Sequence, residues 1–125
     1  MNLNQVTIPS KDVKKAIGFY QKLGLELIVH THDHYARFLC PTGDATFSIH
    51  YREQLNTEGG AIIYFEVPDV AKKVKQLKEK GITFMTETTA QSWAWTEAKL
   101  KDLDGNTLII YHAGENRKNP PWRIQ

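Results

Sequence analysis

Hydrophobic and polar positions near the start of the chain follow the period of an amphipathic helix. Apolar residues recur at the i, i+3, i+4, i+7 spacing of one helix face, at Val13, Ala16, Ile17 and Tyr20. Asp12 stands where an N-cap side chain can accept a backbone N–H, and Gly24 stands where a left-handed C-cap needs no side chain. The pattern predicts a helix between Asp12 and Gly24.

The same plan recurs with a constant offset of 57 residues and no gap, so that Asp12 matches Asp69 and Gly24 matches Gly81. The apolar face of the second helix is formed by Val70, Val74 and Leu77. Such regular spacing indicates a duplicated module rather than two unrelated helices.

Strand-like runs follow each helix, and a glycine-containing tight turn precedes the last run of each set. The runs are residues 25–30, 34–40 and 46–51 in the first half, and residues 82–85, 93–100 and 106–112 in the second. The turns are "PTGDA" (41–45) and "DLDGN" (102–106). With the short run before each helix, the order is β-α-β-β-β twice. This order predicts an α+β fold of two tandem βαβββ modules.

We expect a single domain over residues 1–125. The first module covers about 1–52, the polar linker "REQLNTEGGA" covers 52–61, the second module covers about 61–115 and a tail covers 116–125. In the tail, Pro120 and Pro121 favour an extended chain. The indole of Trp122 is expected to dock on the chain's own surface or on a partner subunit.

Composition limits the class of protein. Charged residues make up 24% of the chain and the formal net charge is +2, which is less basic than dedicated nucleic-acid binders, so we expect no nucleic-acid partner. No apolar run approaches the ~18 residues of a membrane span, and no basic segment followed by an apolar run opens the chain. We therefore expect no membrane span and no signal peptide. The single cysteine, Cys40, allows no internal disulfide and favours a cytoplasmic location.

The duplicated module, the helix "DVKKAIGFYQKLGLEL" and the turn "DLDGN" resemble the vicinal oxygen chelate superfamily over the chain up to about Glu115. That group includes glyoxalase I, bleomycin-resistance proteins, fosfomycin-resistance enzymes and extradiol dioxygenases. The resemblance implies that two mixed sheets curl around a shared cup-shaped cavity, with the helices outside and a small-molecule ligand inside. It also implies a homodimer. Because the superfamily hosts many chemistries, the resemblance leaves the function open.

Strand alternation sorts the residues that would line such a cup, because successive side chains point to opposite faces of a sheet. In residues 46–51, Phe47 and Ile49 are expected to pack on the helix, which leaves Ser48 and His50 toward the cup. The other residues expected to point inward are Gln5, Thr7, Tyr35, Arg37, Ile62, Tyr64, Glu66, Trp95, Glu97, Lys99, Ile109 and Tyr111. Trp93 is expected at the rim.

Metal-dependent members of the superfamily hold a divalent ion with side chains from the first and last strands of each module. The resemblance assigns these positions to Gln5, Ser48, Ile62 and Ile109. Two of them are aliphatic, whereas a transition-metal site generally needs three or more N, O or S donors. We therefore expect no metal cofactor. The alternative is a rebuilt divalent-metal site held by His50 and Glu97.

The stretch "HTHDH" (30–34) places three imidazoles within five residues, but it lies between two predicted strands. Thr31 and Asp33 favour a turn that breaks the alignment of the rings. We interpret the stretch as a solvated turn and not as a metal site.

Two hypotheses explain the inward residues. In the first, the protein is a lyase or isomerase of a polar carbonyl compound, with Glu97 and His50 as base and acid and Tyr64 donating to an oxyanion. Its substrate-binding residues would be Gln5, Thr7, Arg37, Ser48, Trp95, Ile109 and Tyr111. In the second, the protein binds a small molecule or drug without transforming it, as metal-free bleomycin-resistance members do.

Several candidates also have a purely structural interpretation. Glu97 could form a surface ion-pair ladder with Lys99. Arg37 could pair with a carboxylate, and Tyr111 could serve only for packing.

Overall fold

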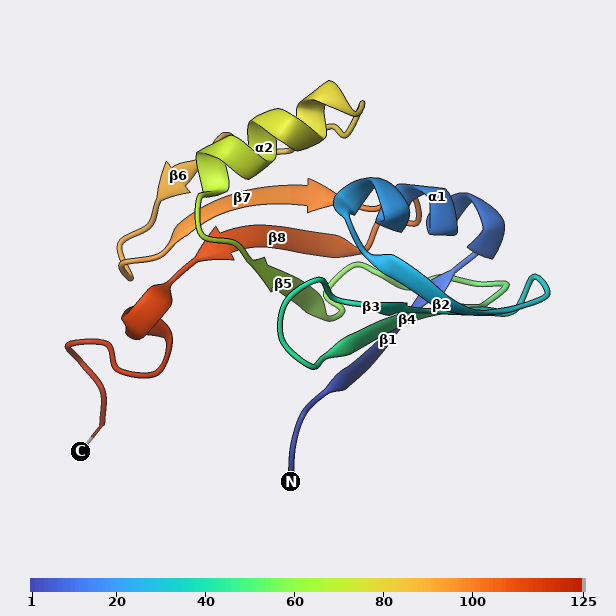
Figure 1. The fold of residues 1–125 in the computed structure, drawn as a ribbon, viewed down its shortest axis with the longest axis horizontal. Coiled ribbons are helices and arrows are strands. Elements are labelled where there is room, and N and C mark those ends of the chain that lie inside the picture. Colours follow the sequence, from blue (N-terminus) through green and yellow to red (C-terminus); the bar gives the residue numbers. More distant parts are fainter. Residues whose placement is uncertain (125) are drawn as a thin grey trace. The chain divides into compact units, whose positions relative to one another are not determined.

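The computed structural model describes residues 1–124, and the chain divides into two compact units. The first is Met1–Ala61 together with Asp102–Asn106, and the second is Ile62–Lys101 together with Thr107–Gln125. Each unit has one α-helix and one four-stranded mixed sheet (Figure 1). The predicted α+β class and the two tandem βαβββ modules are confirmed.

In the first unit the sheet has the strand order β1-β4-β3-β2. Its strands are β1 (Gln5–Ser10), β2 (Glu26–Thr31), β3 (Tyr35–Leu39) and β4 (Thr46–Tyr51). The β1–β4 pair is parallel, and the other pairs are antiparallel. A parallel pair needs a long crossover, and α1 (Val13–Leu23) with the hairpin strands provides it.

The helix α1 begins and ends where its caps predict. Asp12 Oδ1 accepts a hydrogen bond from Lys15 N at 3.1 Å, and Gly24 adopts the left-handed conformation with φ 106°. The apolar face of α1 packs on the sheet, where Tyr20 contacts the rings of Phe38 and Phe47. All three rings are at most 2% exposed, so they form the centre of this unit's core.

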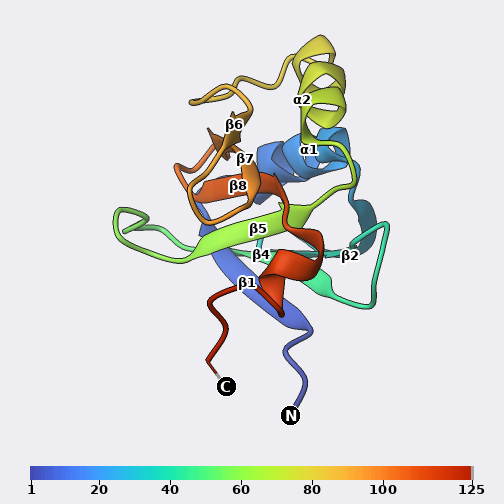
Figure 2. The ribbon, with the colours of Figure 1, turned by 90° about the vertical axis from the view of Figure 1, so that its left-hand side faces the viewer.

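In the second unit the sheet has the strand order β5-β8-β7-β6, again with one parallel pair, β5–β8. Its strands are β5 (Ile62–Glu66), β6 (Thr89–Ala90), β7 (Thr96–Lys101) and β8 (Thr107–His112). The helix α2 (Val70–Glu79) lies along β7 and β8 (Figures 1 and 2). Asp69 Oδ1 accepts from Lys72 N at 3.0 Å, which repeats the N-cap of α1.

Two strand predictions in the second module were wrong. Residues 82–85 form no strand, because the hydrogen bonds between this segment and β7 do not follow a regular ladder. Met85 N and Thr86 N both donate to Lys99 O, at 2.8 and 3.4 Å, and the Thr86 hydroxyl accepts from Lys99 N. The short strand β6 forms instead. Residues 93–95 precede β7 in a tight turn, in which Ala94 has φ 66° and Ala94 N donates to Gln91 O.

The turn Asp102–Asn106 belongs to the first unit, although the strands it joins belong to the second. Asp102 is 7% exposed and accepts four hydrogen bonds: from Tyr20 OH (2.5 Å), Asn106 Nδ2 (2.8 Å) and the amides of Asp104 and Asn106 (both 2.9 Å). Asn106 Nδ2 also donates to Pro9 O at 3.0 Å. The "DLDGN" motif is therefore a buried hydrogen-bonded structure as well as a hairpin turn.

The "HTHDH" stretch contains the turn between β2 and β3, as predicted, with His32 at φ 47° and His34 N donating to Thr31 O. Within residues 1–124 no group of three or more His, Cys, Asp or Glu side chains is placed to hold a metal ion. No helix in this part of the chain has the length and hydropathy of a membrane span.

The tail differs from its prediction. After β8 a 3₁₀ helix, η1 (Gly114–Arg117), forms, and the chain then turns at Pro120, whose carbonyl accepts from Arg123 N at 3.0 Å (Figure 2). The prolines are thus part of a turn and not of an extended segment. Trp122 is 58% exposed, so its indole is not docked on the chain's own surface.

Candidate functional site

Strand register places the candidate residues of the second unit on one face of its sheet. Tyr64 lies opposite Ile109, Lys99 lies opposite the same Ile109, and Glu97 lies opposite Tyr111. Directly opposite residues point to the same side of a sheet. Leu100 and Leu108 alternate with them and are fully buried on the α2 side. Tyr64, Glu97, Ile109 and Tyr111 therefore lie on the face away from α2, and Ile62 shares it.

Three rings on this face form an aromatic cluster, which we define as Tyr64, Trp95 and Tyr111. The Tyr64 ring meets Trp95 and Tyr111 nearly edge-on, at centroid distances of 5.8 and 5.2 Å and interplanar angles of 87° and 80°. Trp95 and Tyr111 lie 4.9 Å apart at 33°. Tyr111 is buried, whereas Tyr64 is 43% exposed. The cluster thus combines a packed base with a ring that a ligand could contact.

Glu97 lies beside this cluster and is only 8% exposed. Its carboxylate accepts a hydrogen bond from Trp93 Nε1 at 3.0 Å, and no ion pair joins it to Lys99. Burial raises the pKa of Tyr64, and the nearby Glu97 charge raises it further. Tyr64 therefore stays protonated at neutral pH next to an acceptor. The turn at Ala94 directs Trp93 toward Glu97, and this contact was not predicted from the sequence.

Glu66 occupies the same face, opposite Tyr111, but its carboxylate binds the segment that follows β8. Its Oε2 accepts from the amides of Ala113 and Gly114 at 2.8 and 3.0 Å, and Arg117 Nε lies 3.9 Å from its Oε1. Burial would raise the pKa of Glu66, but the two amides, His112 and Arg117 together lower it. Trp95 Nε1 also donates to Asn116 O at 3.4 Å, so η1 is held at this end of the sheet.

The first unit collects its candidate polar residues in the same way, on the face away from α1. Ser48 is fully buried, and its Oγ lies 2.6 Å from both Gln5 Nε2 and Thr7 Oγ1. Gln5 Oε1 accepts from Thr46 Oγ1. The side-chain groups of Gln5 and Ser48 are therefore committed to each other and to their neighbours.

Tyr35, which was expected to point inward but was not among the predicted site residues, extends this polar group. Arg37 Nε donates to Tyr35 OH at 2.8 Å. Burial would raise the pKa of Tyr35, but hydrogen bonding with Ser48 and the adjacent Arg37 guanidinium lower it below its usual range. Arg37 thus pairs with a phenol, not with the carboxylate that the structural interpretation required.

His50 packs edge-on against Tyr35, with ring centroids 6.2 Å apart. Arg52 Nη1 lies 2.9 Å from His50 Nδ1. The same Nη1 lies 3.2 Å from His50 Nε2, and because a guanidinium can only donate, the imidazole accepts this bond. Both residues line a pocket of about 350 Å³ with Thr7, Pro9 and Gln54. His50 belongs to the first unit and Glu97 to the second.

The positions that hold a divalent ion in metal-dependent relatives do not provide a metal site in this chain. Gln5 and Ser48 offer two neutral oxygens, both already hydrogen-bonded. Ile62 and Ile109 carry no donor atom and lie on the sheet face away from α2. Since stable transition-metal sites use at least three strong donors, this set does not fit the ion.

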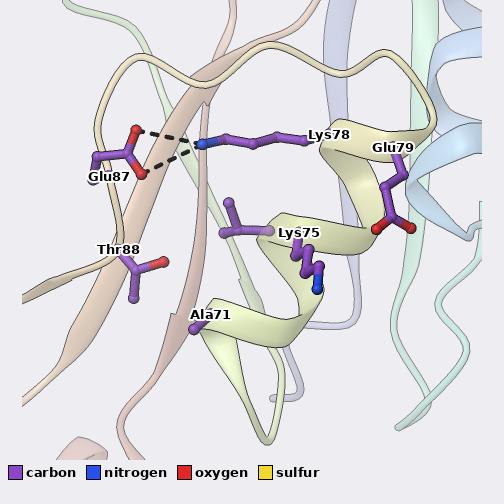
Figure 3. Close-up of a pocket in the computed structure, with 7 residues that line it drawn as sticks. Ala71, Lys75, Lys78, Glu79, Glu87 and Thr88 are labelled. Carbon is purple, nitrogen blue, oxygen red and sulfur yellow. Dashed lines mark hydrogen bonds and ion pairs between the residues drawn. The ribbon is translucent and has the colours of Figure 1, made fainter.

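A pocket of about 570 Å³ lies on the α2 side of the second unit (Figure 3). Lys78 extends from the helix toward Glu87, and its Nζ lies 3.3 Å from each carboxylate oxygen. The other lining residues are Ala71, Val74, Lys75, Glu79 and Thr88. None of the predicted site residues contributes to it, and its ion pair is exposed. We therefore place the candidate site on the opposite sheet face.

The chain belongs to the Glyoxalase/Bleomycin resistance protein/Dioxygenase superfamily, whose family model matches residues 2–110. A curated relative, the uncharacterized protein YurT of Bacillus subtilis (strain 168), is 32% identical over 87 residues. These residues are 70% of this chain but only 59% of the relative, so the chain spans less than two thirds of that protein.

Solved structures share the fold. A lactoylglutathione lyase from Agrobacterium tumefaciens superposes with a TM-score of 0.76 at 15% identity, covering 94% of this chain and 96% of that one. A bleomycin resistance determinant encoded on the transposon Tn5 gives 0.74 at 21%, covering 90% and 98%. A bleomycin-binding protein in complex with bleomycin gives 0.72 at 21%, with the same coverage. At these identities the likeness establishes the fold and leaves the activity open.

Proposed function

We propose that the protein binds a small organic molecule on the aromatic cluster of the second module, and that binding needs no divalent metal. The observation that carries the proposal is the packing of Tyr64, Trp95 and Tyr111 beside the buried Glu97. Apolar and aromatic surface with a few polar groups is typical of small-molecule sites. The bleomycin complex of a protein with the same fold supports this class of function.

Metal independence is supported by the chemistry of the inherited ligand positions. Ile62 and Ile109 cannot coordinate an ion, and Ile109 is 3% exposed within the packed sheet. Aliphatic side chains at these positions instead extend the apolar surface next to Tyr64.

The test uses N-phenyl-1-naphthylamine, a neutral aromatic probe whose fluorescence rises in apolar surroundings, with protein dialysed against EDTA. We expect saturable binding that is unchanged when Zn²⁺ or Mn²⁺ is restored. Trp95→Ala should weaken binding about tenfold, whereas Trp122→Ala, in the exposed tail, should not. Equal effects of the two substitutions would refute the site, and a metal requirement would refute the proposed independence.

A second candidate is a lyase or isomerase acting on a polar carbonyl compound. It is favoured by the Glu97 carboxylate close to the protonated phenol of Tyr64, which together could accept and donate a proton. The acid role predicted for His50, which belongs to the first unit, stays a prediction. Lactoylglutathione serves as the test compound: its recovery unchanged after binding supports a binding protein, and turnover that Glu97→Gln abolishes supports the enzyme.

The proposal extends to assembly and location. A homodimer follows from the family resemblance, and light scattering during gel filtration measures it directly. A cytoplasmic location is supported by the single cysteine, Cys40, whose pKa is raised by burial as expected of an unreactive thiol.

A further inference from the structure

We propose that the ligand bound at the aromatic cluster is a small organic cation, carrying an amine or a quaternary ammonium group, with Glu97 as its counter-charge. The inference rests on the proposed function and names the chemical class of its ligand.

The buried carboxylate of Glu97 is incompletely paired. A carboxylate can accept about four hydrogen bonds, and buried charges are normally paired with an opposite charge. Glu97 is 8% exposed, and its hydrogen-bond donor is the neutral indole of Trp93. Within residues 1–124 no lysine, arginine or histidine forms an ion pair with it. Lys99 shares this sheet face but forms no ion pair with Glu97, so the carboxylate has no ion-pair partner in the described part of the chain.

Glu66 provides the internal comparison on the same face. It receives two backbone amides and lies within 4 Å of both His112 and Arg117, so its charge is balanced inside the unit. The face therefore contains one carboxylate, Glu66, that binds groups of the tail, and a second, Glu97, that can still bind a cationic ligand. Both carboxylates lie near the aromatic cluster, since Glu97 raises the pKa of Tyr64 and Glu66 raises that of Tyr111, but of the two Glu97 has no ion-pair partner among residues 1–124.

The rings beside Glu97 offer aromatic faces to a ligand. The faces of tryptophan and tyrosine attract cations placed within about 6 Å of the ring centre. Tyr64 stands nearly perpendicular to both Trp95 and Tyr111, so the ring faces of the cluster point in different directions. Tyr64 and Trp93 are 43% and 44% exposed and can be reached. Rings combined with a carboxylate favour a cation over a neutral molecule and repel an anion.

The experiment titrates the protein of residues 1–125 with choline and with 3,3-dimethyl-1-butanol, its uncharged carbon isostere. The three tryptophan indole N–H signals in a ¹⁵N-correlated NMR spectrum report the site: Trp93 bonds to Glu97, Trp95 belongs to the cluster, and Trp122 in the tail is an internal reference. We expect choline to shift the Trp93 and Trp95 signals in a saturable way. The isostere should bind about tenfold more weakly.

Glu97→Gln keeps an oxygen for the Trp93 indole but removes the charge, so it should weaken choline binding about tenfold and leave the isostere unaffected. Glu87→Gln is the matched control, because Glu87 is 84% exposed on the α2 side. Equal affinity for the two compounds, or no shift with either, would overturn the cation inference; the wild-type comparison holds even if a variant fails to fold. Binding of the naphthylamine probe would still support the proposed function in that case.

Discussion

Tyr20→Phe removes a single hydroxyl from the core of the first unit and should cost about 2 kcal/mol of unfolding free energy. Tyr20 is fully buried, and its OH donates to Asp102 Oδ2 at 2.5 Å. Hydrogen bonds to charged groups contribute roughly 1.5–3 kcal/mol. We expect a loss of unfolding free energy inside this range, because Asp102 keeps its three other hydrogen-bond donors, from Asp104 and Asn106. The ring contacts with Phe38 and Phe47 survive in the variant.

The same bond makes a prediction about pH. Burial and the Asp102 charge raise the pKa of Tyr20 far above its usual value of 10.0. The folded state therefore keeps the proton while the unfolded chain loses it above pH 10. Stability from this group is complete below pH 10 and falls as pH rises, by about 1.4 kcal/mol at pH 11. The Tyr20→Phe variant has no hydroxyl to titrate at this position and does not lose this stability. The difference in unfolding free energy between wild type and variant should therefore narrow from about 2 kcal/mol below pH 10 to about 0.6 kcal/mol at pH 11.

Urea unfolding of the wild type and the variant at pH 8 and pH 11 measures both effects. Tyr51→Phe is the control, because Tyr51 is 37% exposed and should change stability little at either pH. A gap that stays constant between the two pH values, or a variant as stable as the wild type at pH 8, would refute the role given to the Tyr20–Asp102 bond.

Further substitutions test the cap and the tail. Gly24→Ala should destabilise the protein by about 1 kcal/mol, because Gly24 has φ 106°, which alanine disfavours. Gly18→Ala inside α1 should stabilise it by about 0.5–1 kcal/mol, because nothing lies within 4 Å of the added methyl group. Thermal unfolding of both variants and the wild type measures the two effects. The pKa of Glu66 is lowered, so its hold on the tail should be full above pH 4.5 and lost as pH falls through its folded value. Hydrogen exchange of the Ala113 and Gly114 amides should show this loss as reduced protection at low pH, and Glu66→Gln should remove the pH dependence. Protection that does not change with pH in the wild type would reject the role given to Glu66.

Sequence pattern predicted what depends on local sterics. The caps at Asp12 and Asp69 and the left-handed Gly24 follow from the needs of a helix end, and they appear as expected. Strand alternation assigned sheet faces correctly because the side-chain period of a strand is fixed at two residues. It placed Ile62 and Ile109 on the face away from the helix.

The site could be predicted only in part, because it depends on features without a local signal. Ala94 adopts φ 66°, a conformation that alanine disfavours, and this turn brings Trp93 to Glu97. Tyr35 gains its contacts through the β3–β4 register that sets Arg37 opposite Ser48, and this pairing of two strands has no signal in the local pattern of either strand.

The central claim is that this sheet face binds a small molecule without a metal ion. The most direct measurement is the NMR titration of chelator-treated protein with N-phenyl-1-naphthylamine, read at the indole signals. Our account predicts that Trp95 and Trp93 shift together with the occupied fraction, that Trp122 does not, and that added Zn²⁺ changes nothing. Shifts confined to Trp122, or shifts that appear only once the ion is returned, would contradict it.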